Sequence, residues 1–157
     1  MSRFVVGEIV YADLDCLVET LEEVFGKGHV ERSVDGTNKL VAHGFEGDAR
    51  TKEIGRVAVV VRRQWVGAAS NDIAVRQEAD GTYRLLVSQY DQGVLRARLH
   101  PRSGAPPTGP IAQKYGVKTA TKKLAPLGYT LETTIESDGT IAIVATKPIS
   151  KWAWRTS

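Results

Sequence analysis

Basic residues recur along the chain at a spacing that could bind phosphate groups. Lys114, Lys118 and Lys122 are four residues apart, so on a helix they would form one stripe about 12 Å long at roughly 1.5 Å rise per residue. Lys123 lies beside this stripe. Ammonium groups on one helix face can contact successive phosphates of a nucleic acid or the carboxylates of an acidic protein. A solvated helix face produces the same spacing, so both interpretations stay open.

A second basic cluster precedes the stripe. It consists of Arg96, Arg98, His100 and Arg102. The cluster lies in residues 91–110, whose second half contains "PRSGAPPTGP", and this density of proline and glycine predicts a long exposed loop. Arg62 and Arg63 are expected to end a central strand. With the lysine stripe, these side chains are candidates for binding an anion or a nucleic acid.

The tail, residues 147–157, has the sequence "KPISKWAWRTS". Trp152 and Trp154 are two residues apart and Arg155 follows them. Tryptophan and arginine are favoured at the centres of protein interfaces, so these three residues are candidates for binding a protein partner. Alternating tryptophans also fit a last strand with one face packed inward, and the sequence leaves both alternatives open.

Residues with catalytic or metal-binding chemistry are sparse. The three histidines, His29, His43 and His100, do not stand at metal-ligand spacing. A single cysteine, Cys16, falls on the apolar side of a predicted helix, which excludes an intramolecular disulfide and a cysteine metal cluster. The chain has no phosphate-binding glycine loop and no serine-hydrolase motif. We expect no metal, no cofactor and no catalytic residues, although an enzyme with a dispersed active site stays open.

Composition is typical of a soluble globular protein. Of 157 residues, 42% are hydrophobic and 25% charged, with a net charge of +3. No apolar run is long enough to span a membrane, and the N-terminal sequence "MSRFVVGEIVYADLD" turns acidic where a targeting peptide should not. The sequence therefore predicts one domain over residues 1–157, located in the cytoplasm and without a membrane partner.

Two helices must position these residues. Apolar residues recur at helical spacing from Leu14 to Phe25, with Asp13 as the N-terminal cap and Gly26 at the end. A weaker apolar stripe predicts a second helix that begins near Pro110 and closes before Gly128.

The tripeptide Asp-Gly-Thr occurs at 35–37, 80–82 and 138–140. Between apolar segments this tripeptide indicates a β-hairpin. A three-residue loop with glycine at positive φ sets apolar side chains opposite one another more consistently than a two-residue turn does. The pairs predicted in this way are Val30 with Leu40, Glu31 with Lys39, Val75 with Leu85, Ile73 with Val87, Arg76 with Arg84, Ile135 with Ile141, Thr133 with Ile143, and Leu131 with Ala145. All three copies are thus expected to be hairpin tips.

The order of elements predicts an internal duplication. Residues 3–43 and 83–146 each have the pattern β-α-β-β, and "GRVAVVVRR" and "NDIAVRQE" between them add two strands. The predicted fold class is α+β, with a mainly antiparallel sheet and two helices on one face.

The sequence resembles the family called hypothetical chloroplast open reading frame thirty-five, found in cyanobacteria, plastids, other bacteria and phages. The matching segments are "MSRFVVGEI", "LDCLVETLEEVFG", "NDIAVRQEADGTYRLLV" and "IAQKYGVKTATKKLAPLGYTLETTIESDGTIAIVA". Where the family tends to have a tryptophan-rich stretch and a short connection, this chain has "SQYDQGVLRARLHPRSGAPPTGP". The resemblance implies this fold and brings no assigned catalytic residues. It also implies that genes for AAA-type ATPases can lie near the genes of family members.

We therefore expect a non-enzymatic accessory or adaptor protein that binds a protein partner, either an AAA-type ATPase or a second copy of itself. The alternative is binding of a nucleic acid or a nucleotide through the basic helix and loop.

Overall fold

We describe a computed structural model of the chain over residues 4–44, 54–67, 69, 71–137 and 141–147. These residues form two compact units, 1–112 and 113–157, which are described separately. Helices and antiparallel strands are both present, which confirms the predicted α+β class.

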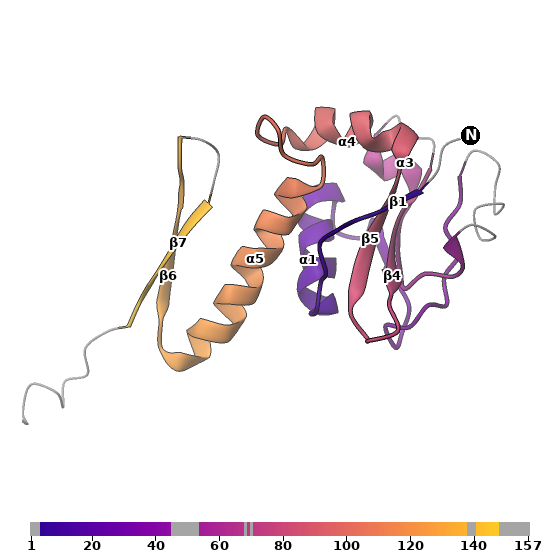
Figure 1. Cartoon of the computed structure of the whole chain (residues 1–157). Coiled ribbons are helices and arrows are strands. Elements are labelled where there is room, and N and C mark those ends of the chain that lie inside the picture. Colours follow the sequence, from indigo (N-terminus) through magenta and orange to yellow (C-terminus); the bar gives the residue numbers. More distant parts are fainter. Residues whose placement is uncertain (1–3, 45–53, 68, 70, 138–140, 148–157) are drawn as a thin grey trace, which may run out of the picture. The chain divides into compact units, whose positions relative to one another are not determined.

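The first unit is built on a five-stranded antiparallel sheet (Figure 1). Its strands are β1 (Phe4–Val6), β2 (Val30–Arg32), β3 (Val59–Val61), β4 (Ile73–Gln77) and β5 (Tyr83–Ser88), in the order β1-β5-β4-β3-β2. The two strands expected between the halves are β3 and β4. All three valines of β3 are buried, since this strand lies between β2 and β4 and both faces of the sheet are covered there.

Helix α1 (Leu14–Phe25) covers one face of this sheet and packs against β2 and β3 (Figure 1). The predicted cap is confirmed, since Asp13 accepts a hydrogen bond from the Cys16 amide at 3.0 Å. Gly26 ends the helix with φ of 111°, a conformation that favours glycine. Cys16 is buried, as its place on the apolar side of the helix predicts.

The other sheet face carries a second apolar cluster. Val60, Ala74 and Leu86 from three neighbouring strands pack there against Ala42 and Ile54. Ala42 and Ile54 thus cover the face opposite to α1, and the sheet is buried on both sides along its central strands.

The hairpin between β4 and β5 has the predicted register. Val75 pairs with Leu85 and Arg76 pairs with Arg84. The like charges are offset by Glu78, whose carboxylate lies 3.4 Å from Arg76 Nη2 and 3.9 Å from Arg84 Nε.

The hairpin predicted at residues 35–37 is wrong. Val30 pairs with Val61 in β3, and Leu40 forms a bridge with Val57. Residues on both sides of the turn therefore add to the same stretch, 57–61, instead of pairing with each other. The buried valines of β3 offer more apolar burial than Leu40 and Lys39 could provide.

The loop predicted over residues 91–110 is also wrong in its first half. After the 3-10 turn Gln89–Asp91, helix α4 spans Gln92–Leu99 and buries Leu95 completely. Proline and glycine are concentrated only after His100, which ends α4 in the left-handed conformation with φ of 49°. Similarly, Arg62 and Arg63 do not end a strand, because they begin the short helix α3 (Arg63–Val66).

The second helix, α5 (Gly109–Leu124), has Pro110 in its first turn as predicted. It starts in the first unit and continues in the second, where the 3-10 turn Ala125–Leu127 leads to Gly128 at φ of 88°.

The second unit also contains a two-stranded sheet of β6 (Thr130–Ile135) and β7 (Ile141–Thr146), separate from the five-stranded sheet. Its register is the predicted one, with Leu131 opposite Ala145 and Thr133 opposite Ile143. The turn residues 138–140 lie outside the described residues. None of the side chains described between 113 and 147 is buried, so the described part of this unit contains no enclosed core.

Candidate protein-binding site

Strand β1 lies at one edge of the five-stranded sheet, beside β5 (Figure 1). The Gly7 amide donates to Leu85 O at 2.8 Å, and Tyr11 and Tyr83 then exchange two backbone hydrogen bonds. One residue of β5 thus faces three residues of the N-terminal segment, Glu8, Ile9 and Val10. These three bulge away from the sheet, as extra residues in an edge pair do.

Arg84 holds this bulge in place. Its Nη1 donates to Gly7 O at 2.9 Å and to Glu8 O at 3.0 Å. The arginine that the hairpin register sets beside Arg76 is therefore turned to the backbone of the edge, where it satisfies two carbonyl groups.

Large apolar side chains are exposed along this edge. Val5 is 40% exposed, Val6 42%, Ile9 40% and Val10 45%. We call residues 5–10 the β1 surface. Because the Gly7 amide is directed to β5, the alternation of an antiparallel ladder directs the backbone groups of Val6 away from β5.

A pocket of about 340 Å³ opens beside the β1 surface within the first unit. Leu85 and Val87 of β5 form part of its wall, with Leu95 of α4 and the proline pair Pro106 and Pro107. The N-terminal segment supplies Val5, Val6, Gly7, Glu8, Ile9 and Tyr11, and Gln92 and Thr108 complete the lining.

Polar side chains are few in the pocket lining. Most lining side chains are apolar, and Glu8 is the one carboxylate among them. The polar side chains of the lining are Glu8, Tyr11, Gln92 and Thr108. An apolar pocket with few polar groups is what a ligand or an inserted side chain requires.

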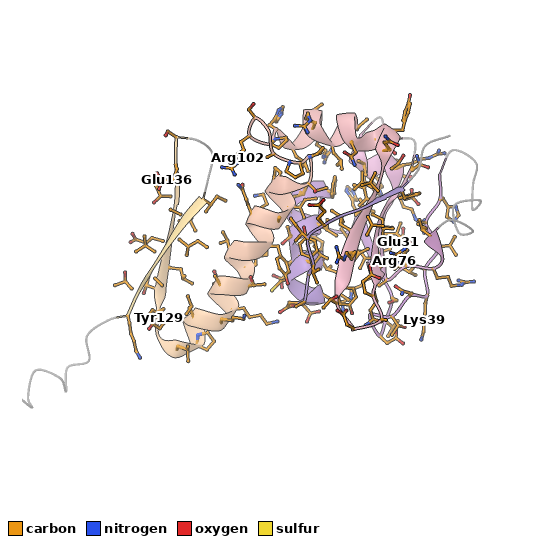
Figure 2. All side chains as sticks on the ribbon, viewed as in Figure 1. Glu31, Lys39, Arg76, Arg102, Tyr129 and Glu136 are labelled. Atoms are coloured by element: carbon orange, nitrogen blue, oxygen red, sulfur yellow. The ribbon has the colours of Figure 1, made fainter. Side chains whose placement is uncertain are left out.

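The opposite edge of the sheet, β2, is protected by charge. Glu31 accepts two hydrogen bonds from Arg62, at 2.6 and 3.2 Å, and Arg32 forms an ion pair with Asp15 at 2.8 Å. Lys39, which is labelled with Glu31 in Figure 2, forms a further ion pair with Asp35. Charged residues on an edge strand oppose pairing with another chain, whereas β1 has valines in the corresponding places.

Behind the β2 edge lies a buried ionic cluster. The Asp72 carboxylate accepts hydrogen bonds at 2.8 Å from Arg62 Nη1 and from the amides of His43 and Arg63. Burial disfavours the charged form of Arg62, but the hydrogen bonds to Glu31 and Asp72 outweigh it and raise the pKa of Arg62. The cluster ties the start of β4 to α3 and β2, which is a structural role.

Asp91 is a second buried carboxylate. Asp91 accepts from the Asn71 amide at 2.9 Å and from Asn71 Nδ2 at 3.2 Å. This contact links the start of β4 to the residues that lead into α4.

The predicted basic cluster is divided by the fold. Arg96 and Arg98 are on α4, where Arg96 Nη1 donates to Ala105 O and Arg98 Nη2 donates to Val24 O, each at 3.3 Å. Arg98 also lies 5.3 Å from the centre of the Phe25 ring. Arg98 thus stabilises the C-terminal end of α1, where a cation is favourable. Arg96 binds the segment that follows α4. His100 caps α4 and Arg102 follows it.

The lysine stripe is present on α5. Lys114 and Lys122 are exposed, Lys118 is half-buried, and Lys123 is exposed beside them. These four lysines belong to the second unit, whereas the arginines of α4 belong to the first.

The partner-binding candidates of the tail, Trp152, Trp154 and Arg155, lie outside the described residues. Within the described ranges no three side chains of histidine, cysteine, aspartate or glutamate gather as a metal site would require. Over the same ranges no helix has the length and hydropathy needed to cross a membrane.

Comparisons with protein-family models, with curated proteins and with solved structures gave no match to this chain.

Proposed function

We propose that this chain is a non-enzymatic accessory protein that binds an extended segment of a protein partner at the β1 surface. The observation that carries the proposal is the contrast between the two edges of one sheet. β2 presents charges held in ion pairs, whereas β1 presents apolar side chains beside an apolar pocket.

The expected mode of binding is addition of a strand to the edge. Backbone hydrogen bonds would form along β1, and alternate side chains of the partner segment would enter the pocket, which gives selectivity. A partner must therefore be extended and must have large apolar side chains at alternate positions. The family resemblance gives the partner class to test first, an AAA-type ATPase.

The proposal is tested by comparing proteins captured by three forms of the chain: wild type, Ile9→Asp and Val34→Asp. Val34 is fully exposed and lies outside the pocket lining, so Val34→Asp is a matched control for adding a carboxylate at an exposed apolar position. Burial of an isoleucine side chain by a bound partner contributes about 1.5–3 kcal/mol to the free energy of binding. Ile9→Asp should therefore lower the affinity roughly tenfold or more.

Capture is measured by quantitative mass spectrometry after nuclease treatment, and the affinity of each recovered partner is then measured with purified proteins. Partners retained by Val34→Asp and lost by Ile9→Asp support the proposal. Equal capture by all three forms would exclude binding at the β1 surface.

Nucleic-acid binding is the second candidate, and one observation favours it. Helix α5 is continuous from Gly109 to Leu124, so the spacing of Lys114, Lys118 and Lys122 does give one stripe along one side of it. Arg96 and Arg98 add little to this candidate, because both are engaged with backbone carbonyls. The stripe alone would bind phosphates, with weak sequence preference.

A further inference from the structure

We propose that the partner segment bound at the β1 surface is basic: it places one large apolar side chain in the pocket and a lysine or arginine next to it, beside Glu8. This inference rests on the proposed function, because it names the chemistry of the partner for that same site. It follows from the residues that face the pocket and from the charge at its rim.

The register of β1 shows which of its positions face the pocket. Val5 pairs with Val87, and in the same register the Gly7 amide donates to Leu85 O at 2.8 Å. Val87 and Leu85 both line the pocket. Residues directly opposite each other in an antiparallel pair have their side chains on the same face. Positions 5 and 7 therefore lie on the pocket face of the sheet.

Gly7 leaves a gap on this face, because it has no side chain. A Cβ there would lie 3.1 Å from Leu85 O and 3.9 Å from Leu85 Cβ, so even a methyl group would be tight against β5. In a strand added to β1, the residue opposite Gly7 can direct its side chain over this gap into the pocket. We call this residue of the partner the anchor. The pocket volume of about 340 Å³ is near the lower end of the roughly 300–1,000 Å³ of ligand pockets, which suits one large apolar side chain.

Glu8 gives the rim of the pocket a negative charge. It is exposed and directly follows Gly7, and among the described residues that line the pocket it is the one with a charged side chain. Residues of a strand are about 3.3 Å apart, so a lysine or arginine within two positions of the anchor can reach the Glu8 carboxylate. An acidic residue at the same place would be repelled.

Arg84 does not cancel this charge, although it lies at the same edge. Its Nη1 donates to Gly7 O at 2.9 Å and to Glu8 O at 3.0 Å, and its Nε lies 3.9 Å from the Glu78 carboxylate. The guanidinium is thus engaged by two carbonyl groups and by a carboxylate of its own hairpin, and it is not part of the pocket lining. The charge that the pocket presents to a partner is therefore that of Glu8.

The test selects binders from a display library of random peptides of roughly twelve residues, longer than a typical strand. The full chain is the target, with Ile9→Asp and Val34→Asp selected in parallel. Peptides bound by wild type and Val34→Asp but not by Ile9→Asp should be enriched in lysine or arginine within two residues of a large apolar residue. The net charge of the chain, +3, attracts acidic peptides instead, so this enrichment cannot come from non-specific attraction.

Variants of Glu8 then test the charge with the strongest such peptide, made synthetically. Glu8→Gln should lower its affinity about 1.5- to 5-fold, as loss of an exposed ion pair does, and Glu8→Lys should lower it further. A peptide with glutamate in place of its basic residue should bind Glu8→Lys better than it binds wild type. Glu19→Lys is the matched control, because Glu19 is exposed on α1 and lies outside the pocket lining. Cooperative unfolding by circular dichroism shows that each variant is folded.

The outcomes separate this inference from the proposed function. A basic preference that Glu8→Lys removes and Glu19→Lys keeps supports the inference. If the peptides that depend on Ile9 show no basic preference, or lose as much affinity with Glu19→Lys as with Glu8→Lys, the proposed function stands and this inference fails. If no enriched peptide depends on Ile9, both fail. Self-association of the wild type in analytical ultracentrifugation that Ile9→Asp abolishes would assign the edge to a second copy and also overturn the inference.

Discussion

The guanidinium of Arg62 lies 2.8 Å from the carboxylate of Asp72, a side chain that is only 1% exposed. A pair between Arg32 and Asp15 has the same separation, but both of its side chains are exposed, at 37% and 68%. These two ion pairs of equal length thus differ in burial, and Asp72 also accepts hydrogen bonds from the amides of His43 and Arg63.

We expect Asp72→Ala to destabilise the first unit by about 2–5 kcal/mol, because it leaves two amides without their acceptor and removes one of the two carboxylates that pair with Arg62. Asp15→Ala should cost about 0.2–1 kcal/mol, as exposed pairs do. Asp72→Asn should fall between them, since one acceptor oxygen remains. Urea unfolding measures all three, and an Asp72→Ala variant no less stable than Asp15→Ala would refute the structural role of the cluster.

The second prediction concerns the Asp-Gly-Thr turns. Thr82 donates to Asp80 Oδ1 from its hydroxyl at 2.5 Å and from its amide at 3.0 Å, and these bonds lower the pKa of Asp80. Thr37 makes the same two contacts with Asp35, at 2.7 and 3.0 Å. There the ion pair with Lys39 is the larger cause of a pKa held well below its usual range.

Thr82→Ala should raise the pKa of Asp80 toward its ordinary value, and Thr82→Ser should leave it low. A lowered pKa in the folded state contributes stability that is present above the unfolded value, about pH 4, and is lost as the pH falls through the folded value. The acid side of the stability profile should therefore be shallower in Thr82→Ala. Carboxyl NMR titration checks the assignment, with Thr37→Ala as a control that leaves Asp80 unchanged.

These turns also show what sequence can and cannot predict. The local part was predictable: glycine has positive φ in both described copies, 74° at Gly36 and 86° at Gly81. The pairing around each copy was not, because it depends on which strand the flanking residues meet. At Asp80 the neighbouring segments pair with each other, whereas at Asp35 both are taken by the stretch 57–61.

The same distinction applies to the candidate site. A strand at the start of residues 3–43 was predicted from the β-α-β-β pattern, and β1 occupies Phe4–Val6. Its exposure depends on the strand order, which places β1 at an edge. The pocket depends further on Leu95, in a helix that the sequence did not predict. A signal was present, since "VLRARLH" contains neither proline nor glycine, but its apolar pattern is too short to distinguish a helix from a loop.

The third prediction compares Gly36 and Gly81, the glycines of the two described Asp-Gly-Thr turns. A Cβ at position 81 would meet no atom within 4 Å, so Gly81→Ala should cost only the left-handed backbone strain, about 1–2 kcal/mol. At position 36 the added carbon would lie 3.0 Å from Leu14 Cδ2 and 3.1 Å from the Tyr83 hydroxyl, which itself donates to Gly36 O at 3.0 Å.

Gly36→Ala should therefore be the more destabilising change, with a further loss of about 1–3 kcal/mol from overpacking. Chemical denaturation of the two variants decides the order. Equal losses would show that Leu14 and Tyr83 move aside without strain.

The last prediction tests the lysine stripe on α5. Lys114, Lys118 and Lys122 occupy successive turns of one helix, and a protein that neutralises phosphates releases counterions, so its affinity falls linearly on a log–log plot against salt. Changing all three to glutamine should flatten that slope by about two to three units, near one for each lost phosphate contact. A matched triple change of Arg32, Lys39 and Arg56 to glutamine, in the first unit, should leave the slope as it is. Fluorescence anisotropy with single- and double-stranded oligonucleotides measures both variants. If the wild-type chain binds no oligonucleotide at low salt while capture at the β1 surface persists, the stripe is a solvated helix face and protein binding at the β1 surface is the function that remains.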